Sequence, residues 1–429
     1  MSEQDIYDIV IVGGGSAGLF GSARVSELMH KGKKVLLLEK TGSLGNKLCL
    51  SGNSQCNFTN GCDMKDFRKH YGENGNFLKD ALYQLSNIKL IDFFSSKGLE
   101  TIMREDKKVF PKSLISDDIK KTLISQAKKY PVDIKVNSKL EKIEYKADGI
   151  ILGISIKKSD NKYYEHKIKT KYLILCTGGA SYPETGSTGD VIKLLKNFNI
   201  KTHYFKPALT FPLINSINNG QTIPFDLGHL SGVTFPNAFL SIIRNDKTIY
   251  TQSGALLFTH IGLSGPLILD NSRYFEKGDS LRVYLTDFKD KSELEKKLFD
   301  LIEKYPKRKI SNIINQLGIP ERVIEYVLKG FNTDKKSAEL SKSQRKSLVN
   351  SLFCIEFLVL GFESINSAMC SKGGVDLSEI DKKNMMLKKL PNVFVAGECI
   401  DIDGDTGGYN IHAAFATVNL IIKYLSSLM

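Results

Sequence analysis

The pattern of hydrophobic and polar positions predicts the same kind of structure at both ends of the chain. Near the N-terminus an apolar run at 9–12 breaks into glycines and then into helix-compatible sequence, and a second apolar run follows at 34–38. Near the C-terminus an apolar run at 392–397 precedes a helix predicted over 411–425. Short apolar runs that alternate with helices are typical of buried parallel strands. We therefore expect both ends to contribute to one α/β domain.

The region between the two ends carries further periodic segments. Apolar residues at helical spacing predict one helix over 76–97 and another over 117–129. Alternating residues predict a β-meander within 140–169, and a separate buried strand follows at 171–176. These segments extend the N-terminal domain.

The pattern of residues changes after the first two hundred positions. Prolines punctuate short β-like runs, and a lysine-rich stretch at about 288–350 has helical periodicity. We predict a first part of the α/β domain over 1–195, an inserted β-rich domain over 196–371 with a helical subdomain at 288–350, and a second part of the α/β domain over 372–429.

Length and composition agree with this division. A chain of 429 residues exceeds what one hydrophobic core usually supports, and 41% hydrophobic with 25% charged residues is ordinary for a globular protein. The N-terminus lacks the basic region and cleavage site of a secretory signal, and no apolar stretch approaches the roughly 20 residues of a membrane span. We expect a cytoplasmic protein that does not enter a membrane.

Cysteine usage and charge exclude some functions. The seven cysteines are odd in number and contain no CxxC pair, so neither a disulfide framework nor a metal site is expected. The net charge of +13 comes from lysines scattered in singles and pairs, which indicates a solvated lysine surface. A nucleic-acid partner is therefore not expected, although a modest attraction for anionic substrates is.

The glycine-rich turn after the first strand carries the strongest chemical signal. Gly13 permits the tight turn, Gly15 lets the backbone approach a pyrophosphate, and Gly18 allows close packing of strand and helix. The second strand ends in Glu39, twenty-one residues after Gly18, where a carboxylate accepts hydrogen bonds from ribose hydroxyls. The turn comprises Gly13, Gly14, Gly15, Ser16, Ala17 and Gly18. A dinucleotide is the ligand that this arrangement favours.

Three other segments indicate which dinucleotide binds. The loop at 41–60 is rich in glycine, asparagine and serine and suits a polyanion and a polar ring edge. The strand that ends at 176 continues into Thr177 and two glycines, which permits close approach of a nucleotide. A third segment, 393–410, couples a strand to Glu398, a glycine pair and a helix start that can stabilise a reduced flavin ring. Glycine motifs far apart on one sheet fit FAD better than NAD.

Taken together, the motifs resemble those of the YhiN or BaiN type flavoproteins, which are also known as aminoacetone oxidase family FAD-binding enzymes. The first motif is shared by many flavoproteins, whereas the combination is specific to this family and covers nearly the whole chain. The matching motifs are GGGSAG at 13–18, LCLSGNSQCNFTN at 48–60, VFPKS at 109–113, CTGGASYPETGSTGD at 176–190, LLFTHIGLSGP at 256–266 and AGECIDIDGDTGGYNIHAAFA at 396–416.

The resemblance implies a Rossmann-type FAD-binding domain of the glutathione-reductase-like kind, with an inserted β-barrel-like domain that carries the helical subdomain. It places the pyrophosphate on the first glycine turn, the adenosine ribose on Glu39 and the flavin between the two domains. The further residues expected to bind FAD are Lys40, Asn46, Lys47, Ser51, Gly52, Asn57, Val136, Thr177, Gly178, Gly397, Glu398, Gly408, Tyr409 and Asn410.

Two positions depart from the family pattern. The family usually has arginine where this chain has Gln55, and often glycine where it has Val418. The first change removes a cation that would meet an anionic substrate or the flavin edge. Substrates of relatives are therefore not carried over to this chain.

Two residues are candidates for catalysis. Cys56 lies in the flavin loop as a redox thiol, but Cys49 and Cys62 are poorly spaced to be its partner, and the alternative is a small buried residue packed by the cofactor. His260 is a proton donor if the inserted domain covers the flavin, and otherwise a histidine hydrogen-bonded in a β-turn. Tyr182 and His412 are weaker candidates of the same kind.

The predicted function is that of an FAD-dependent oxidoreductase that transfers hydride through the flavin N5 to or from a small organic substrate. It either reduces an unsaturated compound, with NADH or NADPH as a transient donor, or oxidises an amine. The absence of a second complete GxGxxG unit means that a nicotinamide would visit the substrate cleft. Two alternatives stay open: an RNA-associated flavoprotein of the tRNA-modification type, and a flavin-binding protein without turnover. The oligomeric state is also open.

Overall fold

The chain forms two compact units in a computed structural model. Unit 1 comprises Met1–Ala208 and Ser364–Met429, and unit 2 comprises Leu209–Glu363. The inserted unit is shorter than the predicted 196–371, because β10 (Thr202–Ala208) pairs antiparallel with β18 (Cys370–Val375) inside unit 1. The residues that the structure describes are 5–28, 32–130, 132–218, 221–224, 227–286, 288 and 290–428.

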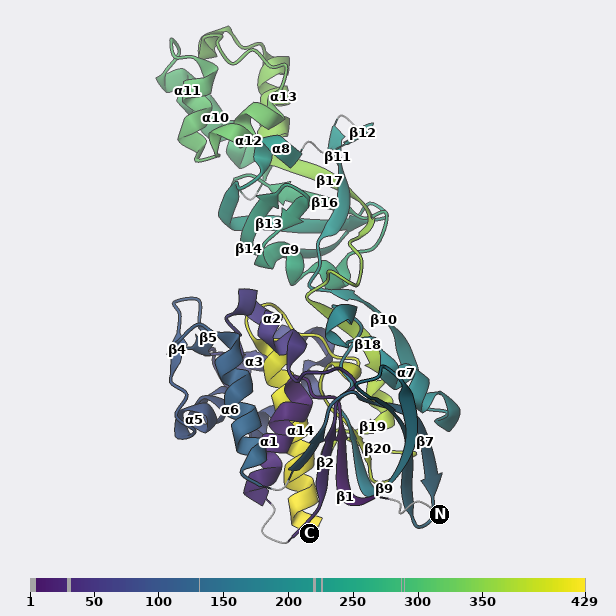
Figure 1. Cartoon of the computed structure of the whole chain (residues 1–429). Coiled ribbons are helices and arrows are strands. Elements are labelled where there is room, and N and C mark those ends of the chain that lie inside the picture. The colour runs from purple at the N-terminus through teal and green to yellow at the C-terminus, as the bar shows by residue number, and fades with distance from the viewer. Residues whose placement is uncertain are drawn as a thin grey trace. The chain divides into compact units, whose positions relative to one another are not determined.

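A nine-stranded mixed sheet forms the centre of unit 1 within the described residues (Figure 1). Five neighbouring strands are parallel, in the order β21-β9-β1-β2-β6. β2, β21 and the C-terminal parts of β1 and β9 are continuous apolar runs, because both faces of a parallel sheet are covered there. Their bounds are β1 (Asp5–Val12), β2 (Val35–Leu38), β6 (Val132–Lys135), β9 (Tyr163–Leu175) and β21 (Val393–Val395).

The register of the parallel strands aligns their carboxyl ends. Val12 lies opposite both Leu38 and Leu175. Leu38 in turn lies opposite Lys135, and Leu175 lies opposite Val395. The five strands therefore end in one row, and whatever follows them in sequence emerges along one edge of the sheet.

Antiparallel strands extend this sheet beyond its five parallel strands. β7 and β8 form the predicted meander with β9, and β19 and β20 continue from β21. The sequence pattern predicts two separate strands, the last meander strand at 164–169 and a buried strand at 171–176. In the structure they are one continuous strand, β9, because its first half pairs with β8 and its second half with β1. The bounds are β7 (Ser138–Lys146), β8 (Gly149–Lys157), β19 (Ile380–Asp381) and β20 (Met386–Leu387).

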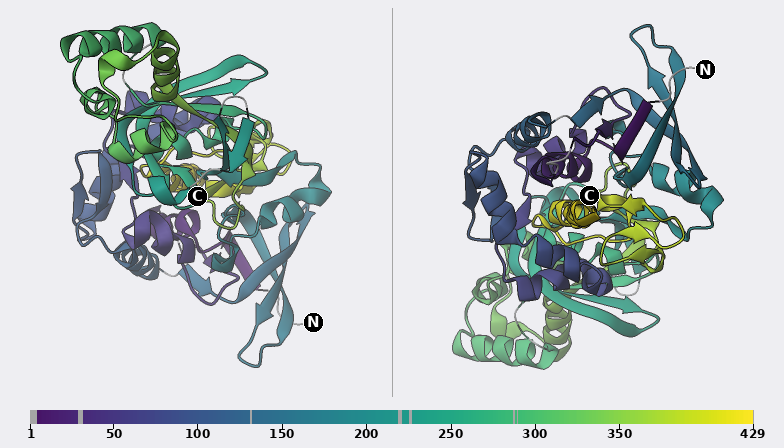
Figure 2. Two further views of the ribbon diagram at one scale, coloured as in Figure 1. Left: turned by 90° about the horizontal axis from the view of Figure 1, so that it is seen from above. Right: turned by 90° about the horizontal axis from the view of Figure 1, so that it is seen from below.

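Three helices lie side by side along the parallel strands: α1 (Ser16–Leu28), α6 (Ser116–Lys128) and α14 (Tyr409–Leu428) (Figures 1 and 2). Phe20 of α1 stacks on Phe415 of α14 with ring centroids 4.6 Å apart. Gly21 faces Val418, and a Cβ added at Gly21 would lie 2.6 Å from the Val418 side chain. The family often has glycine at position 418, whereas this chain has valine there. Gly21 on the facing helix α1 leaves room for the valine side chain.

The helix predicted over 76–97 is in fact two helices, α4 (Lys79–Gln84) and α5 (Asn87–Ser96). Ser86 separates them, because its side chain accepts the Lys89 backbone N–H and so begins a new helix. The remaining elements of unit 1 are α2 (Asn46–Ser54), β3 (Thr59–Asn60), α3 (Met64–Phe67), the 3-10 helix η1 (Arg68–Asn76), β4 (Thr101–Met103), β5 (Lys108–Pro111), η2 (Pro183–Thr185), α7 (Asp190–Leu195), η3 (Lys196–Phe198), η7 (Leu377–Glu379) and η8 (Gly397–Cys399).

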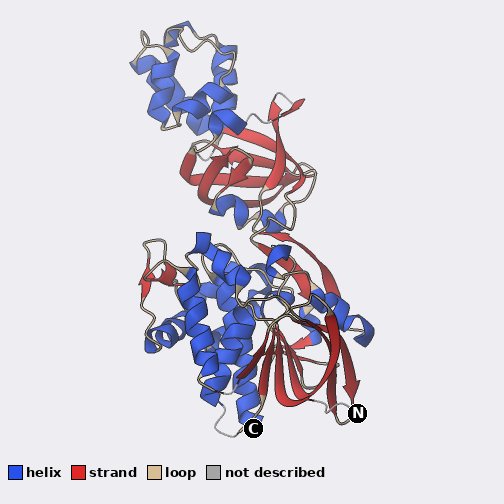
Figure 3. Ribbon diagram, in the orientation of Figure 1, coloured by secondary structure: helices blue, strands red, loops and turns tan. Residues whose placement is uncertain are grey.

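Unit 2 contains a seven-stranded antiparallel sheet among its described residues, in the order β12-β11-β17-β16-β13-β14-β15 (Figure 3). A Cβ added at Gly262 of β15 would lie 3.5 Å from the Pro212 carbonyl of β11, so the sheet curls nearly into a closed barrel. The bounds are β11 (Pro212–Asn218), β12 (Gln221–Pro224), β13 (Thr234–Arg244), β14 (Lys247–Thr259), β15 (Gly262–Ser264), β16 (Ser280–Tyr284) and β17 (Cys354–Phe362).

The lysine-rich stretch forms helices, as predicted from its periodicity. Leu294 and Leu298 of α10 are buried in the same cluster as Leu281 and Val283 of β16, so helices and barrel share one core. The helices are α8 (Leu227–Leu230), α9 (Pro266–Leu269), α10 (Lys291–Lys304), α11 (Ile310–Ile314), α12 (Glu321–Val327) and α13 (Lys342–Phe353), with short 3-10 turns η4 (Ser272–Tyr274), η5 (Asn315–Leu317) and η6 (Ser337–Glu339).

By length and composition, α14 could cross a membrane, which the sequence pattern did not predict. However, 61% of its apolar stretch is buried inside the structure. Its residues from Ala413 to Ile422 belong to the core of unit 1. Burial of this kind is typical of the central helix of a folded domain.

Candidate functional site

The row of strand ends in unit 1 brings together residues predicted from distant motifs. Gly13 follows β1, Glu39 follows β2, Val136 follows β6 and Thr177 lies two residues beyond β9. Gly397 lies two residues beyond β21, and a Cβ added to it would lie 3.0 Å from the Cβ of Ala17 in α1. In an open parallel sheet, ligands bind along this edge.

The glycines of the first turn have three different environments. Gly13 has a φ of +105°, and a Cβ there would lie 2.2 Å from the Cys176 carbonyl oxygen. A Cβ on Gly18 would lie 1.8 Å from the Gly13 carbonyl oxygen, so this glycine permits the helix to pack on the strand. A Cβ on Gly15 would meet no atom within 4 Å. Gly15 therefore borders open space at the N-terminus of α1, where a pyrophosphate would find backbone N–H donors.

Glu39 is tied to the glycine turn. Its Oε2 accepts the Gly14 backbone N–H at 2.7 Å, and its Oε1 accepts the N–H and the hydroxyl of Thr41 at 2.7 and 2.8 Å. The adjacent Lys40 forms an ion pair with Asp190 at 2.7 Å. The carboxylate is thus held in place at the end of β2, where the sequence predicts the ribose.

The segment at 46–57 contains α2 and concentrates unusual backbone conformations, which interrupt that helix at 51–53. Gly52, Asn53 and Ser54 have φ angles of +58°, +54° and +63°, and Cys56 follows at +57°. Left-handed conformations cost energy for residues other than glycine and cluster at ligand sites. The loop is further shaped by Asn46, whose side chain donates to the Thr41 hydroxyl at 3.2 Å and to the Thr185 carbonyl at 3.4 Å, and by Ser51, whose hydroxyl donates to the Leu48 carbonyl at 2.6 Å.

Lys47 and Glu398 form an ion pair at 2.8 Å that joins the loop to η8. The Lys47 ammonium also donates to the Ser181 hydroxyl. The Oε1 of Glu398 accepts the backbone N–H and the hydroxyl of Ser371 at 2.8 and 2.9 Å. Two residues predicted to touch different parts of FAD therefore lie in one polar network.

The last helix begins beside β3. Gly408 has a φ of +96°, and a Cβ there would lie 2.6 Å from the Thr59 carbonyl oxygen. Asn410 exchanges two hydrogen bonds of 2.8 Å with the backbone of Gly404. Tyr409 is buried and begins α14, whose N-terminal N–H groups carry a partial positive charge.

Three buried polar atoms at this edge make no hydrogen bond within the described part of the chain. They are Asn57 Oδ1, Thr177 Oγ1 and Ser187 Oγ. Buried polar groups are almost always paired, so such atoms indicate ligand partners. Asn57 and Thr177 are residues predicted to bind FAD. Ser187 lies next to Gly178, the residue after Thr177, because a Cβ on Gly178 would be 3.3 Å from its hydroxyl.

A cation lies beside Gln55, the position where the family has arginine. The Arg104 guanidinium donates to the Gln55 side-chain oxygen at 2.7 Å and lies 4.0 Å from the centroid of the Phe110 ring. A positive charge is therefore present beside Gln55, supplied from the segment between β4 and β5.

The catalytic candidates have contrasting environments. Cys56 is fully buried, and burial raises the pKa of its thiol to about 12, so it is a protonated, packed side chain. His260 is exposed in the turn between β14 and β15 of unit 2. His412 is fully buried between the Thr59 hydroxyl (2.7 Å) and the Leu85 carbonyl (2.9 Å). Tyr182 has a φ of +53° ahead of η2.

Sequence reasoning missed several residues of the site. Ser181 and Ser187 lie inside the motif at 176–190, so their hydroxyls were available as a signal. Ser371 and Arg104 carry no local signal, because only the folded chain brings them to Glu398 and Gln55.

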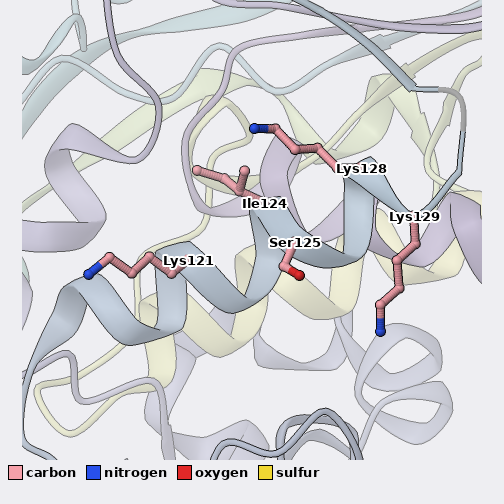
Figure 4. A pocket seen from close by; sticks show the side chains of 5 residues that line it. All are labelled: Lys121, Ile124, Ser125, Lys128 and Lys129. Atoms are coloured by element: carbon pink, nitrogen blue, oxygen red, sulfur yellow. The ribbon is translucent and has the colours of Figure 1, made fainter.

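Figure 4 shows an open depression elsewhere on unit 1, on the exposed face of α6. Its lining residues are Lys121, Ile124, Ser125, Lys128 and Lys129. The first four belong to α6 and Lys129 directly follows it, and none is a candidate site residue. The described residues also contain no group of three or more histidine, cysteine, aspartate or glutamate side chains placed to hold a metal ion.

These features define a nucleotide-binding protein of the Rossmann type. They are a parallel sheet with this glycine turn, an acidic residue at the end of the second strand, and a last helix that approaches the site closely. The sequence profile of the HI0933-like protein Rossmann domain matches residues 7–422, and the chain belongs to this family. The expected family, fold class and enzyme class, a flavin-dependent oxidoreductase, are thereby confirmed.

Individual relatives span almost the full chain. The ribosomal RNA dihydrouridine synthase of Haemophilus influenzae is 28% identical over 410 residues, which cover 95% of this chain and 96% of that protein. The 3-dehydro-bile acid delta(4,6)-reductase of Clostridium scindens is 23% identical over 418 residues, with 95% and 96% covered. The crystal structure of 3-ketosteroid delta1-dehydrogenase from Sterolibacterium denitrificans shares the fold, with a TM-score of 0.50, 11% identity, and 99% and 100% of the two chains covered.

Proposed function

We propose that the chain binds FAD along the strand ends of unit 1 and reduces a carbon–carbon double bond conjugated to a carbonyl, with a uridine of ribosomal RNA as the leading substrate. The observation that carries the cofactor assignment is the row of strand ends with its three unpaired buried atoms, Asn57 Oδ1, Thr177 Oγ1 and Ser187 Oγ. When bound, FAD supplies hydride chemistry at its central ring.

Each end of the cofactor has matching residues. Gly15 and the N-terminus of α1 face a pyrophosphate, and Glu39 faces the adenosine ribose. At the flavin end, Asn57 offers an acceptor and α14 offers its N-terminal N–H groups. Lys47 lies within the same network as Glu398 and supplies a cation beside the loop. These groups bind and orient the cofactor and stabilise negative charge on its ring.

The relatives favour reduction over amine oxidation. A dihydrouridine synthase and a bile acid reductase act on different molecules, but both names describe saturation of a double bond conjugated to a carbonyl. Hydride addition at one carbon of such a bond places negative charge on the carbonyl oxygen, and the other carbon then takes a proton. His260 stays a predicted proton donor for this step.

A cluster of positive charge in unit 2 favours RNA over a small molecule. We define the basic turn as Lys304 at the end of α10, Lys307, Arg308 and Lys309 after it, together with Lys335 and Lys336. The two segments are joined by hydrogen bonds, from the Ser337 N–H to the Arg308 carbonyl at 2.8 Å and from the Ile310 N–H to the Lys335 carbonyl at 3.0 Å. Asp334 neutralises one charge through an ion pair with Lys309 at 2.8 Å.

The basic turn also contains an aromatic ring. Arg308 lies 4.1 Å, and Lys304 5.3 Å, from the centroid of the Tyr305 ring. Residues 291–353 as a whole carry 14 lysines and arginines against 8 aspartates and glutamates. A local excess of cations beside an aromatic side chain suits a phosphate backbone. From sequence alone we did not expect a nucleic-acid partner. The local charge of the basic turn and the similarity to a ribosomal RNA dihydrouridine synthase now favour RNA as the substrate.

The proposal is tested by anaerobic reduction of FAD-loaded protein with NADPH or NADH, followed by mixing with an unmodified ribosomal RNA transcript. We expect the transcript to reoxidise the flavin and to gain dihydrouridine, detected by mass spectrometry of nucleosides. Reoxidation by small conjugated enones but not by RNA would replace RNA with a small-molecule substrate. Flavin that is reduced by primary amines and reoxidised by neither would overturn the reductase assignment.

RNA binding is tested separately with Lys307→Ala/Arg308→Ala/Lys309→Ala. Loss of two or three phosphate contacts lowers the slope of log affinity against log salt by about 2 to 3. The matched control, Lys121→Ala/Lys128→Ala/Lys129→Ala on α6, removes the same charge from exposed positions. Equal salt slopes for both variants would remove the basic turn from the proposal. The compartment that we propose, the cytoplasm, agrees with seven free cysteines.

A further inference from the structure

A cysteine and a histidine from one segment of the chain meet an aspartate from a distant segment beside the start of α14. Cys62 follows β3, His70 lies in η1, and Asp405 lies four residues before Tyr409. His70 Nδ1 lies 2.9 Å from Asp405 Oδ2 and its ring stacks on Tyr409, while the Cys62 sulfur lies 3.4 Å from the Tyr409 hydroxyl, so Cys62 and His70 share Tyr409 as a neighbour. No sequence motif predicts this cluster.

The backbone around the cluster is held by specific hydrogen bonds. The Cys62 N–H donates to Asn60 Oδ1 at 2.9 Å, and the Asn87 side chain donates to the Cys62 carbonyl at 2.9 Å. The Asp405 N–H donates to the His70 carbonyl at 2.8 Å, so these two residues are tied by backbone as well as side chain. The His70 ring stacks on Tyr409 with centroids 4.1 Å apart and an angle of 14° between the planes. The three reactive groups are thus fixed before any reactant arrives.

The charges around Cys62 favour its ionised form. Burial raises the pKa of the thiol, but hydrogen bonds to His70 and Tyr409 and the charges of His70 and Lys107 outweigh burial and lower it below its ordinary value. Burial likewise opposes the charged form of His70, but Asp405 and Cys62 together raise its pKa to about 9. A thiolate beside a protonated imidazole is therefore the expected state near neutral pH.

Cysteines elsewhere in unit 1 provide a contrast. Cys56, Cys176 and Cys399 are buried, and burial raises the pKa of each thiol. Cys62 and Cys49 are only partly buried. Among the cysteines of the described structure, Cys62 thus combines access with a histidine that is itself oriented by a carboxylate, which is the arrangement of an activated nucleophile.

We propose that Cys62, His70 and Asp405 form a second reactive site, in which the Cys62 sulfur attacks small electrophiles, hydrogen peroxide above all. His70 holds the proton, and Asp405 is a positioning residue that orients the imidazole. This inference does not depend on FAD or on the proposed substrate.

The reaction with peroxide balances without another reactant. The Cys62 thiolate attacks one peroxide oxygen, an S–O bond forms and the O–O bond breaks. The leaving hydroxide takes the proton from His70 and departs as water. Sulfur is oxidised by two electrons to the sulfenic acid, peroxide is reduced by two electrons, and His70 is left neutral.

The test measures alkylation of each cysteine in the folded, full-length protein by iodoacetamide from pH 5 to 10, with peptide mass spectrometry. We expect half-maximal alkylation of Cys62 at least one pH unit below the value of about 8.5 for an ordinary thiol. At pH 6.5 we expect Cys62 to react at least about tenfold faster than Cys49, which is also partly buried but lies outside this cluster. His70→Gln should move the Cys62 profile back towards 8.5, and Asp405→Asn should move it part of the way.

A matched control is available in unit 1. His203→Gln removes a histidine of the same kind, which lies 2.6 Å from Asp376, and should leave the Cys62 profile unchanged. Dimedone labelling after peroxide treatment should mark Cys62 in the wild type and far less in His70→Gln. If His70→Gln does not fold, the comparison of Cys62 with Cys49 in the wild type still decides. A Cys62 midpoint near 8.5, or alkylation no faster than that of Cys49, would overturn the proposal.

Discussion

The backbone N–H of Gly14 donates a hydrogen bond of 2.7 Å to Glu39 Oε2, across 25 residues of sequence. This bond ties the first glycine turn to the end of the second strand, so the two parts of the predicted nucleotide site are held as one piece. Glu39 is buried, with 8% of the residue exposed, and its carboxylate accepts hydrogen bonds from backbone and hydroxyl donors.

Replacement of Glu39 tests this link. Hydrogen bonds to charged groups contribute about 1.5 to 3 kcal/mol. Glu39→Gln should therefore weaken FAD binding by roughly ten- to a hundredfold, and Glu39→Ala should weaken it further and lower the melting temperature, because the Gly14 N–H loses its acceptor. Fluorescence titration of the apoprotein measures the affinity. Glu141→Gln, at an exposed carboxylate on β7, serves as the control. Equal affinity of Glu39→Ala and wild type for FAD would show that Glu39 does not bind the ribose.

The two glycines of the turn should respond differently to a methyl group. Gly13→Ala forces a side chain into a φ of +105° and against the Cys176 carbonyl, at a cost of about 3 kcal/mol or more in the free energy of unfolding. Gly15→Ala meets no neighbour and should cost less than about 1 kcal/mol, yet it should impair FAD binding. Urea denaturation of both apoproteins distinguishes them. A larger loss of stability in Gly15→Ala would contradict the assigned roles.

Buried His412 makes stability depend on pH. Burial is the largest cause that lowers its pKa, to about 4, from an ordinary value of 6.5. The unfolded chain therefore binds a proton more readily than the folded one. The stability is present in full above pH 6.5 and falls as pH drops towards 4, by about 3 kcal/mol in total.

The prediction for His412 is measured as the free energy of unfolding at pH 7.5 and pH 4.5, in the wild type and in His412→Gln. The variant should be less stable at pH 7.5, and its stability should decline less on acidification, so the gap between the two proteins narrows. His70 acts in the other direction, since its raised pKa of about 9 contributes stability that is lost as pH rises through 9. An unchanged gap across the two pH values would mean that His412 does not titrate as described.

The parts of the fold that could be predicted are those encoded by local pattern. The runs predicted as strands at 9–12, 34–38 and 392–397 contain the apolar parts of β1, β2 and β21, which are parallel strands of the same sheet. Because the carboxyl ends of parallel strands share an edge, the glycine and acidic residues that follow them were expected together. The division of 76–97 into two helices depends on one N-cap residue, Ser86. The spacing of apolar residues by three and four positions does not reveal this cap.

The parts that could not be predicted depend on contacts between distant segments. Lys47 and Glu398 are 351 residues apart, and each was expected at the cofactor rather than at the other. Cys62 was considered only as a partner of Cys56, whereas it lies beside His70 and Asp405. Arg104 was not considered, although it restores a positive charge beside Gln55. In each case the residue type is ordinary and only the fold supplies its partner.

The central claim is that unit 1 binds FAD at the edge where its parallel strands end. The most direct measurement is equilibrium binding of FAD to apoprotein, with wild type and Gly15→Val compared at equal folded concentration. We expect one FAD per wild-type chain and none on the folded variant, because the added side chain fills the space that faces the pyrophosphate. Stoichiometric FAD on Gly15→Val, or no FAD on the wild type, would contradict the account.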